Sequence, residues 1–238
     1  MAQDPGRPAR NVAQRRGATL ERGTAGRSAD AEYRRRLARD AALRKRQYGP
    51  FAWVVTALAG ERQSTRAWST GADGERRVGA ELERALGVRG IVLHDRRLPG
   101  TRGNIDHIAV APSGVWIVDA KEYRGRVESR DVGGWLTRDV ALYVGRRDRS
   151  SALEGVRRQR DKVGAVLHDA FGDDAPALHA AICLVGAEWA WFARPMRFDG
   201  VWVTWPRRLG AMLLQTAVLD AGRIERVAGV LARRFPVR

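Results

Sequence analysis

A short stretch of this chain combines acids and a lysine in a spacing that suits chemistry on a phosphate. Side chains alternate faces along a β-strand, so a strand over residues 115–121 places Asp119 and Lys121 on one face. If a tight turn pairs this strand with residues 104–110, Asp106 lies directly opposite Asp119. Opposed buried carboxylates must share a proton or bind a cation. Hard oxygen ligands of this kind suit Mg²⁺ or Mn²⁺.

A third acid, Glu75, lies on a predicted helix over residues 72–87. At 100° per residue, Val78, Leu82 and Leu86 share one face, and Glu75 falls near the centre of that stripe. Glu75 therefore points inward near the helix N-terminus, where the helix dipole favours negative charge. It is either a first-turn acid that stabilises the helix or a third ligand for the same cation. A divalent metal beside a lysine is a set that hydrolyses phosphodiesters.

The elements that must position these residues follow from hydrophobic periodicity and turn residues. Strands are predicted at 91–94, 104–110, 115–121, 140–144, 180–185 and 201–204, and helices at 72–87, 151–170, 206–219 and 222–234. Mixed strands with helices before and after them predict one α/β domain over residues 67–238, with a mixed central sheet flanked by helices.

The charge of the chain is high and unevenly distributed. The 238 residues hold 43 Lys and Arg against 27 Asp and Glu, a formal net charge of +16. Residues 1–48 alone hold 13 basic and 5 acidic side chains. This excess predicts a polyanionic partner, nucleic acid or anionic lipid, or else only aids solubility. Only three basic residues are lysines, at 45, 121 and 162, which makes Lys121 more notable.

The first part of the chain is predicted to be a disordered basic arm over residues 1–49. Residues 1–30 have almost no large apolar side chains and cannot offset the entropy of ordering. Residues 31–47 could form a basic helix on a polyanion, where Arg34, Arg35 and Arg36 would contact nucleic acid. Residues 50–66 are predicted to be a short apolar helix followed by a linker.

The composition excludes several other classes of protein. No apolar run approaches the ~20 residues that cross a bilayer, and no secretory signal is visible. Cys183, the single cysteine, makes no intramolecular disulfide, and with four scattered histidines it builds no structural zinc site. We therefore expect the protein to lie in a reducing cytoplasm, with or without association with the nucleoid.

Three blocks of sequence carry a family resemblance: Gly71–Val78 (GADGERRV), Asn104–Val110 (NIDHIAV) and Pro112–Gly125 (PSGVWIVDAKEYRG). In this order they resemble the nuclease-related domain (NERD) family. That family is assigned to the restriction-endonuclease-like superfamily with a PD-(D/E)xK core, and the resemblance covers about residues 67–170.

The resemblance implies a role for each acid and for the lysine. Glu75 matches the helix acid, Asp106 the metal-binding aspartate, and Asp119 with Lys121 the (D/E)xK pair. Many members have Glu where this chain has Asp119. Gln159 resembles a glutamine that related nucleases bring to the site, although the usual preceding Asn-Pro is absent, and an exposed helix residue is the other interpretation.

Further residues are candidates for contacts with nucleic acid. Tyr123, Arg124 and Arg126 follow the lysine strand and are expected either to contact phosphates at the rim of the site or to form a solvated loop. His94 and Asp95 end the preceding predicted strand, where a general-base role has no further support in the sequence.

The resulting hypothesis is a Mg²⁺- or Mn²⁺-dependent nuclease that hydrolyses phosphodiester bonds of DNA. A first alternative is a non-catalytic nucleic-acid-binding module that retains the nuclease fold. A second is a basic protein on an anionic membrane surface. A homodimer is compatible with the sequence.

Overall fold

The computed structural model describes residues 20–48, 63–101, 103–134 and 139–238, which contain five α-helices and eight strands. The helices are α1 (Arg27–Tyr48), α3 (Gln63–Leu86), α4 (Ser150–Phe171), α5 (Pro206–Leu213) and α6 (Ala221–Arg234). The strands are β1 (Ile91–Arg97), β2 (Asn104–Ala111), β3 (Gly114–Asp131), β4 (Val140–Val144), β5 (Arg147–Asp148), β6 (Leu178–Glu188), β7 (Met196–Phe198) and β8 (Val201–Thr204). None of the described helices is long and apolar enough to cross a membrane.

The strands form one mixed sheet in the order β1-β2-β3-β6-β8-β7, which confirms the predicted α/β class. The β1-β2, β2-β3 and β7-β8 pairs are antiparallel, whereas β3-β6 and β6-β8 are parallel. The parallel β3-β6 pair requires a crossover, and α4 supplies it. Sequence periodicity did not predict the short strands β5 and β7.

Strand β3 is much longer than predicted because it serves two pairings. Its first half lies between β2 and β6, and its last five residues pair with β4. The register with β6 shifts between Glu122 and Gly125, where β3 bends. Gly125 has a φ of 112°, and a Cβ there would stand 2.9 Å from Gly145 Cα. A glycine is therefore required where the strand leaves the main sheet.

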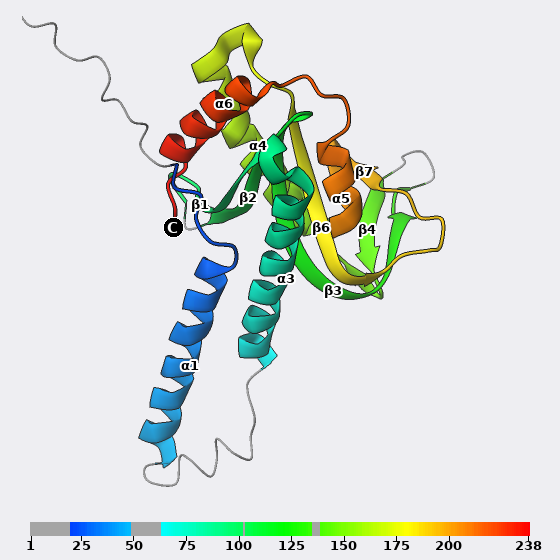
Figure 1. The fold of residues 1–238 in the computed structure, drawn as a ribbon. Coiled ribbons are helices and arrows are strands. Elements are labelled where there is room, and N and C mark those ends of the chain that lie inside the picture. The colour runs from blue at the N-terminus through cyan, green and yellow to red at the C-terminus, as the bar shows by residue number, and fades with distance from the viewer. Residues whose placement is uncertain (1–19, 49–62, 102, 135–138) are drawn as a thin grey trace, which may run out of the picture.

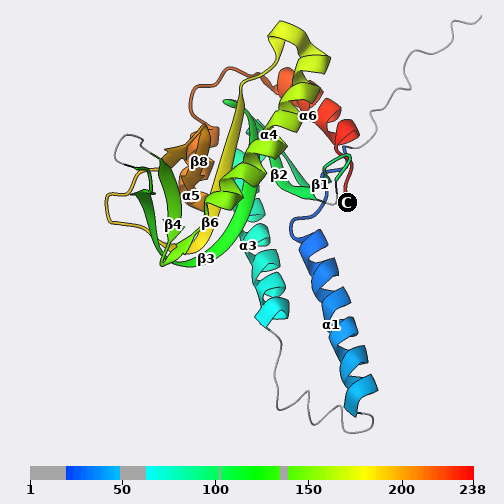
Figure 2. The ribbon, with the colours of Figure 1, turned by 180° about the vertical axis from the view of Figure 1, so that it is seen from behind.

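Helices cover both faces of the sheet. Helix α3 lies in front of the sheet in Figure 1, and α4 crosses in front of it in the reverse view of Figure 2. One core contains side chains of α4 and α6, and the other contains side chains of α3 and α5. Because both faces are covered, β2 is buried from Ile105 to Ala111, and Asp106 and His107 are the polar side chains in this buried stretch.

Helix α3 begins at Gln63, earlier than the predicted start at residue 72. The predicted linker and the predicted domain boundary at 67 therefore overlap the first turns of this helix. Helix α5 ends at Leu213 rather than at 219. The short apolar helix predicted around residues 51–59 lies outside the described residues.

The arm is described only from Leu20, and residues 1–19 of the predicted disordered segment lie outside the description. Residues 20–30 are ordered against the domain, which their composition did not predict. The backbone amide of His94 donates to the Arg22 carbonyl at 2.7 Å. Gly23 permits this contact, because a Cβ at its φ of 77° would stand 2.3 Å from the His94 carbonyl oxygen. Helix α1 begins earlier than predicted and lies beside α3 in both views.

Candidate active site

The hairpin of β2 and β3 has the predicted register. Val110 pairs with Val115, and the last pair of the ladder is His107 with Val118. Beyond that pair, the Asp106 side chain takes the place of a backbone partner, because its Oδ2 accepts from the Ala120 amide at 2.9 Å. Asp106 therefore lies where the two strands separate, one residue before the last ladder pair.

Asp119 and Lys121 lie next to each other on β3, as strand alternation predicts. Lys121 Nζ is 2.7 Å from Asp119 Oδ2. Asp106 and Asp119 are each only 7% exposed, whereas a third of the Lys121 side chain is exposed. Lys121 thus lies between the buried carboxyl groups and solvent. We call Glu75, Asp106, Asp119 and Lys121 the carboxylate site.

The electrostatics of the carboxylate site follow from burial and mutual repulsion. Burial raises the pKa of Asp106 well above its usual range, and the charges of Asp119 and Glu75 raise it further, while Lys121 opposes the shift. Desolvation disfavours the charged form of Lys121, but Asp119 and Asp106 outweigh it and raise the pKa of the ammonium above its ordinary value. Lys121 is therefore positively charged at neutral pH.

Glu75 is brought to the same site by α3. Val78, Leu82 and Leu86 pack that helix on the sheet, as their stripe predicted. Because α3 begins at Gln63, Glu75 lies within the helix, and the expected stabilisation by the helix N-terminus does not apply. Burial raises the pKa of Glu75 to about 7, against the opposing charge of Lys121.

The donor atoms of the carboxylate site decide whether it could hold a divalent cation. In the described ranges, no three His, Cys, Asp or Glu side chains are grouped so that they could hold a metal ion. The donor chemistry nevertheless fits, because Glu75 Oε2 is buried without a hydrogen-bond partner in the described structure. Asp106 is a second buried carboxylate whose charge is opposed by its acidic neighbours. A hard cation would satisfy both groups.

Gln159 reaches the start of β2 rather than the carboxylates. Its Nε2 donates to the Asn104 carbonyl at 3.1 Å, and its buried Oε1 has no partner within the described residues. The helix glutamine thus holds the backbone two residues before Asp106. This contact makes it a positioning residue in the structure.

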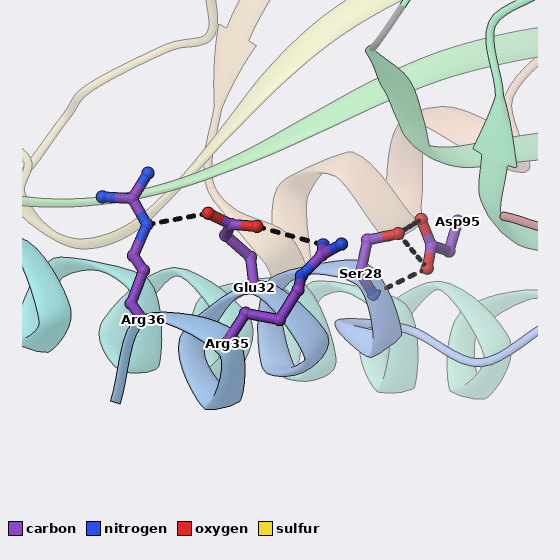
Figure 3. A network of polar contacts seen from close by, with 5 residues as sticks. All are labelled: Ser28, Glu32, Arg35, Arg36 and Asp95. Carbon is purple, nitrogen blue, oxygen red and sulfur yellow. Dashed lines mark hydrogen bonds and ion pairs between the residues drawn. The ribbon is translucent and has the colours of Figure 1, made fainter. Parts of the chain in front are cut away.

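Asp95 is a residue of this region to which the sequence assigned no supported role. It is fully buried on β1 with a φ of 50°, and its charge helps to raise the pKa of Glu75. Its carboxylate accepts from the Ser28 amide at 2.8 Å, from the Ser28 hydroxyl at 2.6 and 2.7 Å, and from Asn104 Nδ2 at 2.9 Å. Figure 3 shows Ser28 turned toward this carboxylate. An acid inside an apolar strand was the signal in the sequence, but its partner lies 67 residues away.

Arg34, Arg35 and Arg36 lie on α1, and Arg35 and Arg36 each contact an acid of the same helix. Arg35 and Arg36 both pair with Glu32, at 3.0 and 2.9 Å (Figure 3), and Arg34 is exposed on the same helix. The helix extends away from the sheet in Figures 1 and 2. Arg76, next to Glu75 in the chain, pairs with Asp30 at 2.7 Å and so ties the arm to α3.

The rim residues follow Lys121 along β3. Arg124 and Arg126 are exposed, and Arg126 is 3.9 Å from Glu128. Tyr123 is half-buried under the Arg149 guanidinium, whose carbon lies 4.1 Å from the ring centroid. The two arginines are therefore available for phosphates, whereas the tyrosine ring already has a cationic partner.

Comparison with models of protein families finds one family that matches this domain. The sequence model of the NERD family, the nuclease-related domain, matches residues 70–185, from α3 to β6. This segment contains Glu75, Asp106, Asp119 and Lys121. This match of residues 70–185 to the NERD model confirms the resemblance read from the three sequence blocks. No curated protein and no solved structure matches the chain significantly.

Proposed function

We propose that this protein is a metal-dependent nuclease that hydrolyses phosphodiester bonds of DNA. One observation carries the proposal: Asp106 and Asp119 are buried together beside the Lys121 ammonium, inside a nuclease-related domain. Burying two carboxyl groups carries a desolvation penalty that lowers the stability of the fold. Perturbed pKa values of this kind cluster at functional sites. The net charge of +16 favours a polyanionic substrate around this acidic centre.

Each residue of the carboxylate site has a role in this proposal. Glu75, Asp106 and Asp119 would hold Mg²⁺ or Mn²⁺, which when bound supplies a Lewis acid and an acidified water. Lys121 carries its charge at neutral pH, so its ammonium can orient the attacking water and offset the negative charge that develops on the phosphoryl oxygens.

Binding is assigned to basic side chains outside the carboxylate site. Arg124 and Arg126 would contact phosphates at the rim, and Arg34, Arg35 and Arg36 would add affinity that does not depend on sequence. Because these contacts release counterions, DNA binding should weaken steeply as salt is raised.

The test is cleavage of plasmid and single-stranded DNA by the full chain with Mg²⁺, Mn²⁺ or EDTA. Cleavage should require a divalent cation and should be lost in Asp119→Asn, which keeps the shape of the side chain. Asp173→Asn, a change on an exposed turn, is the matched control and should cleave as the wild type does. Equal cleavage by wild type and Asp119→Asn preparations would reject the proposal.

A specific observation favours a second candidate, a non-catalytic nucleic-acid-binding module. No three-ligand group is formed within the described residues, and Lys121 already pairs with Asp119 Oδ2. This candidate predicts salt-sensitive DNA binding without cleavage under any divalent cation. The same cleavage experiment, run beside a filter-binding titration, therefore separates the two.

A further inference from the structure

Two consecutive large aromatic residues after strand β6 are exposed to solvent. Trp191 is 97% exposed and Phe192 is 85% exposed. Single exposed apolar residues are common on proteins, but adjacent rings with almost no packing partners are characteristic of a binding surface. We call these two residues the aromatic platform.

The aromatic platform borders a cavity of about 430 Å³, which is lined by Arg126, Glu188, Trp189, Ala190, Trp191 and Phe192. Trp189 anchors this segment, because its ring packs on Trp205 with centroids 4.9 Å apart. Its Nε1 is buried and has no hydrogen-bond partner among the described residues. The cavity therefore combines a fixed ring, two free rings and a donor that lacks an acceptor.

The aromatic platform follows directly from the strands that form the carboxylate site. In the parallel pair of β3 and β6, Lys121 lies beside Leu184, and Arg126 lies beside Glu188. Along β6, Glu188 follows Leu184 by four residues, which corresponds to roughly 13 Å at ~3.3 Å per residue. The loop after β6 leaves the sheet at this end of the two strands, as Figure 1 shows in yellow and gold.

The basic side chains around the aromatic platform suit a polyanion, and Glu188 is the one acid among the described residues that line the cavity. Arg124, Arg126 and Arg194 are all exposed. Within the described residues, neither Arg124 nor Arg194 forms an ion pair, and Arg126 has only the long contact to Glu128. Exposed rings beside unpaired guanidinium groups are the elements that bind single-stranded nucleic acid, where bases stack and phosphates pair with cations.

We propose that Trp191 and Phe192 stack on unpaired bases of a nucleic-acid strand whose phosphates run past Arg126 toward the carboxylate site. This inference rests on the proposed function and narrows its substrate to single-stranded or locally unpaired nucleic acid. Bases inside a duplex stack on each other and cannot offer their faces to the rings, so the aromatic platform discriminates against intact duplex.

The test measures binding alone, in EDTA, with a labelled 20-nucleotide single strand and the matching duplex. The double variant Trp191→Ala/Phe192→Ala should bind the single strand at least about tenfold more weakly, since each stacked ring contributes roughly 5- to 150-fold. Its duplex affinity should change less than twofold. Trp191→Tyr/Phe192→Tyr keeps both rings and should restore the single-strand affinity. Val88→Ala removes another fully exposed apolar side chain and should change neither affinity.

The outcomes separate the aromatic platform from the nuclease activity. Ring-dependent binding of the single strand supports the platform even if the wild type cuts no DNA. If the wild type cuts DNA but the double variant still binds the single strand normally, the platform is overturned and the nuclease stands. Equal losses for single strand and duplex would also overturn it. So would ring-dependent self-association in sedimentation, or ring-dependent binding to phosphatidylglycerol vesicles in place of the single strand.

Discussion

Two neighbouring residues of β2 belong to different buried polar clusters, which differ in the charge of their side chains and in the direction of their pKa shifts. Asp106 belongs to the carboxylate site. His107, the next residue, is fully buried, and its Nδ1 lies 2.9 Å from His94 Nδ1. His94 in turn contacts Glu83 through Nε2 at 2.9 Å. One cluster gathers acidic side chains beside a lysine, and the other is an edge-to-face pair of histidine rings.

The difference separates, on one strand, a residue of the proposed nuclease site from a residue expected to serve stability. Burial and the neighbouring His94 lower the pKa of His107 to about 3, so the ring stays neutral and is tolerated in the core. Burial raises the pKa of Asp106 instead, and its carboxylate neighbours add to the shift. The histidine pair is therefore expected to stabilise the fold. The carboxylate site is expected to lower the free energy of unfolding, as functional sites commonly do.

The largest expected effect comes from removing the lysine of the carboxylate site. Lys121→Met should lower the rate of DNA cleavage by about 10²–10³-fold, because the positive charge that offsets developing negative charge is lost. Lys162→Met is the control, because among the described residues that ammonium donates to the Pro99 carbonyl, and the variant should cleave as the wild type does. Single-turnover cleavage rates measure both. A loss of less than threefold for Lys121→Met would contradict the assigned role.

His107→Ala should change stability rather than chemistry. Removing this buried ring leaves a cavity and takes away the partner of His94, which should lower the free energy of unfolding by about 2–4 kcal/mol. Urea denaturation followed by tryptophan fluorescence gives the value. Cleavage per folded molecule should stay within a fewfold of the wild type. A stable variant that has lost cleavage would show that the histidine pair belongs to the active site.

Glu75→Gln should raise the free energy of unfolding, in contrast to His107→Ala, and the size of the gain should depend on pH. The pKa of Glu75 is near 4.5 in the unfolded chain and about 7 in the fold. The unfolding free energy of the wild type therefore falls as pH rises from 4.5 to 7, by at most about 3 kcal/mol from this group. At pH 8 the variant should be about 1–3 kcal/mol more stable than the wild type.

The same variant should lose this advantage below pH 4.5, where Glu75 is protonated in both states. Urea midpoints at pH 4 and pH 8 test the crossing. Glu83→Gln is a contrasting variant on the same helix, because Glu83 is exposed and contacts His94. It should gain nothing at pH 8. An equal gain for both variants would point to the net charge rather than to burial of Glu75.

The smallest expected effect concerns the arm. Ser28→Ala removes the hydroxyl that contacts both oxygens of Asp95 and leaves a buried carboxylate with fewer donors. The free energy of unfolding should fall by about 1–2 kcal/mol, and amides of residues 20–30 should exchange faster with solvent. Ser151→Ala, at an exposed position on α4, is the control. Unchanged exchange in the arm would show that Asp95 does not hold it.

The fold and the site were predictable to different extents. The register of the β2-β3 hairpin followed from four turn residues, and this register predicts that Asp106 lies near Asp119. The start of α3 was missed, because its first turns carry no apolar stripe that the periodicity could detect. The order of residues 20–30 was missed for a related reason. Small residues look unable to pack, yet the Arg22 carbonyl accepts from the His94 amide on β1, and the Ser28 hydroxyl donates to the Asp95 carboxylate on the same strand.

The sequence by itself determined the hairpin, the shared face of Asp119 and Lys121, the inward stripe of α3 and the resemblance to the nuclease-related family. These depend on local alternation, helical periodicity and short motifs, all of which are written along the chain. Only the tertiary structure decided that Asp95 joins the arm to the site, that Gln159 holds the start of β2, and that the aromatic platform follows the strands of Lys121. Those contacts join residues that are far apart in sequence, and their partners are chosen by how the sheet is ordered and covered.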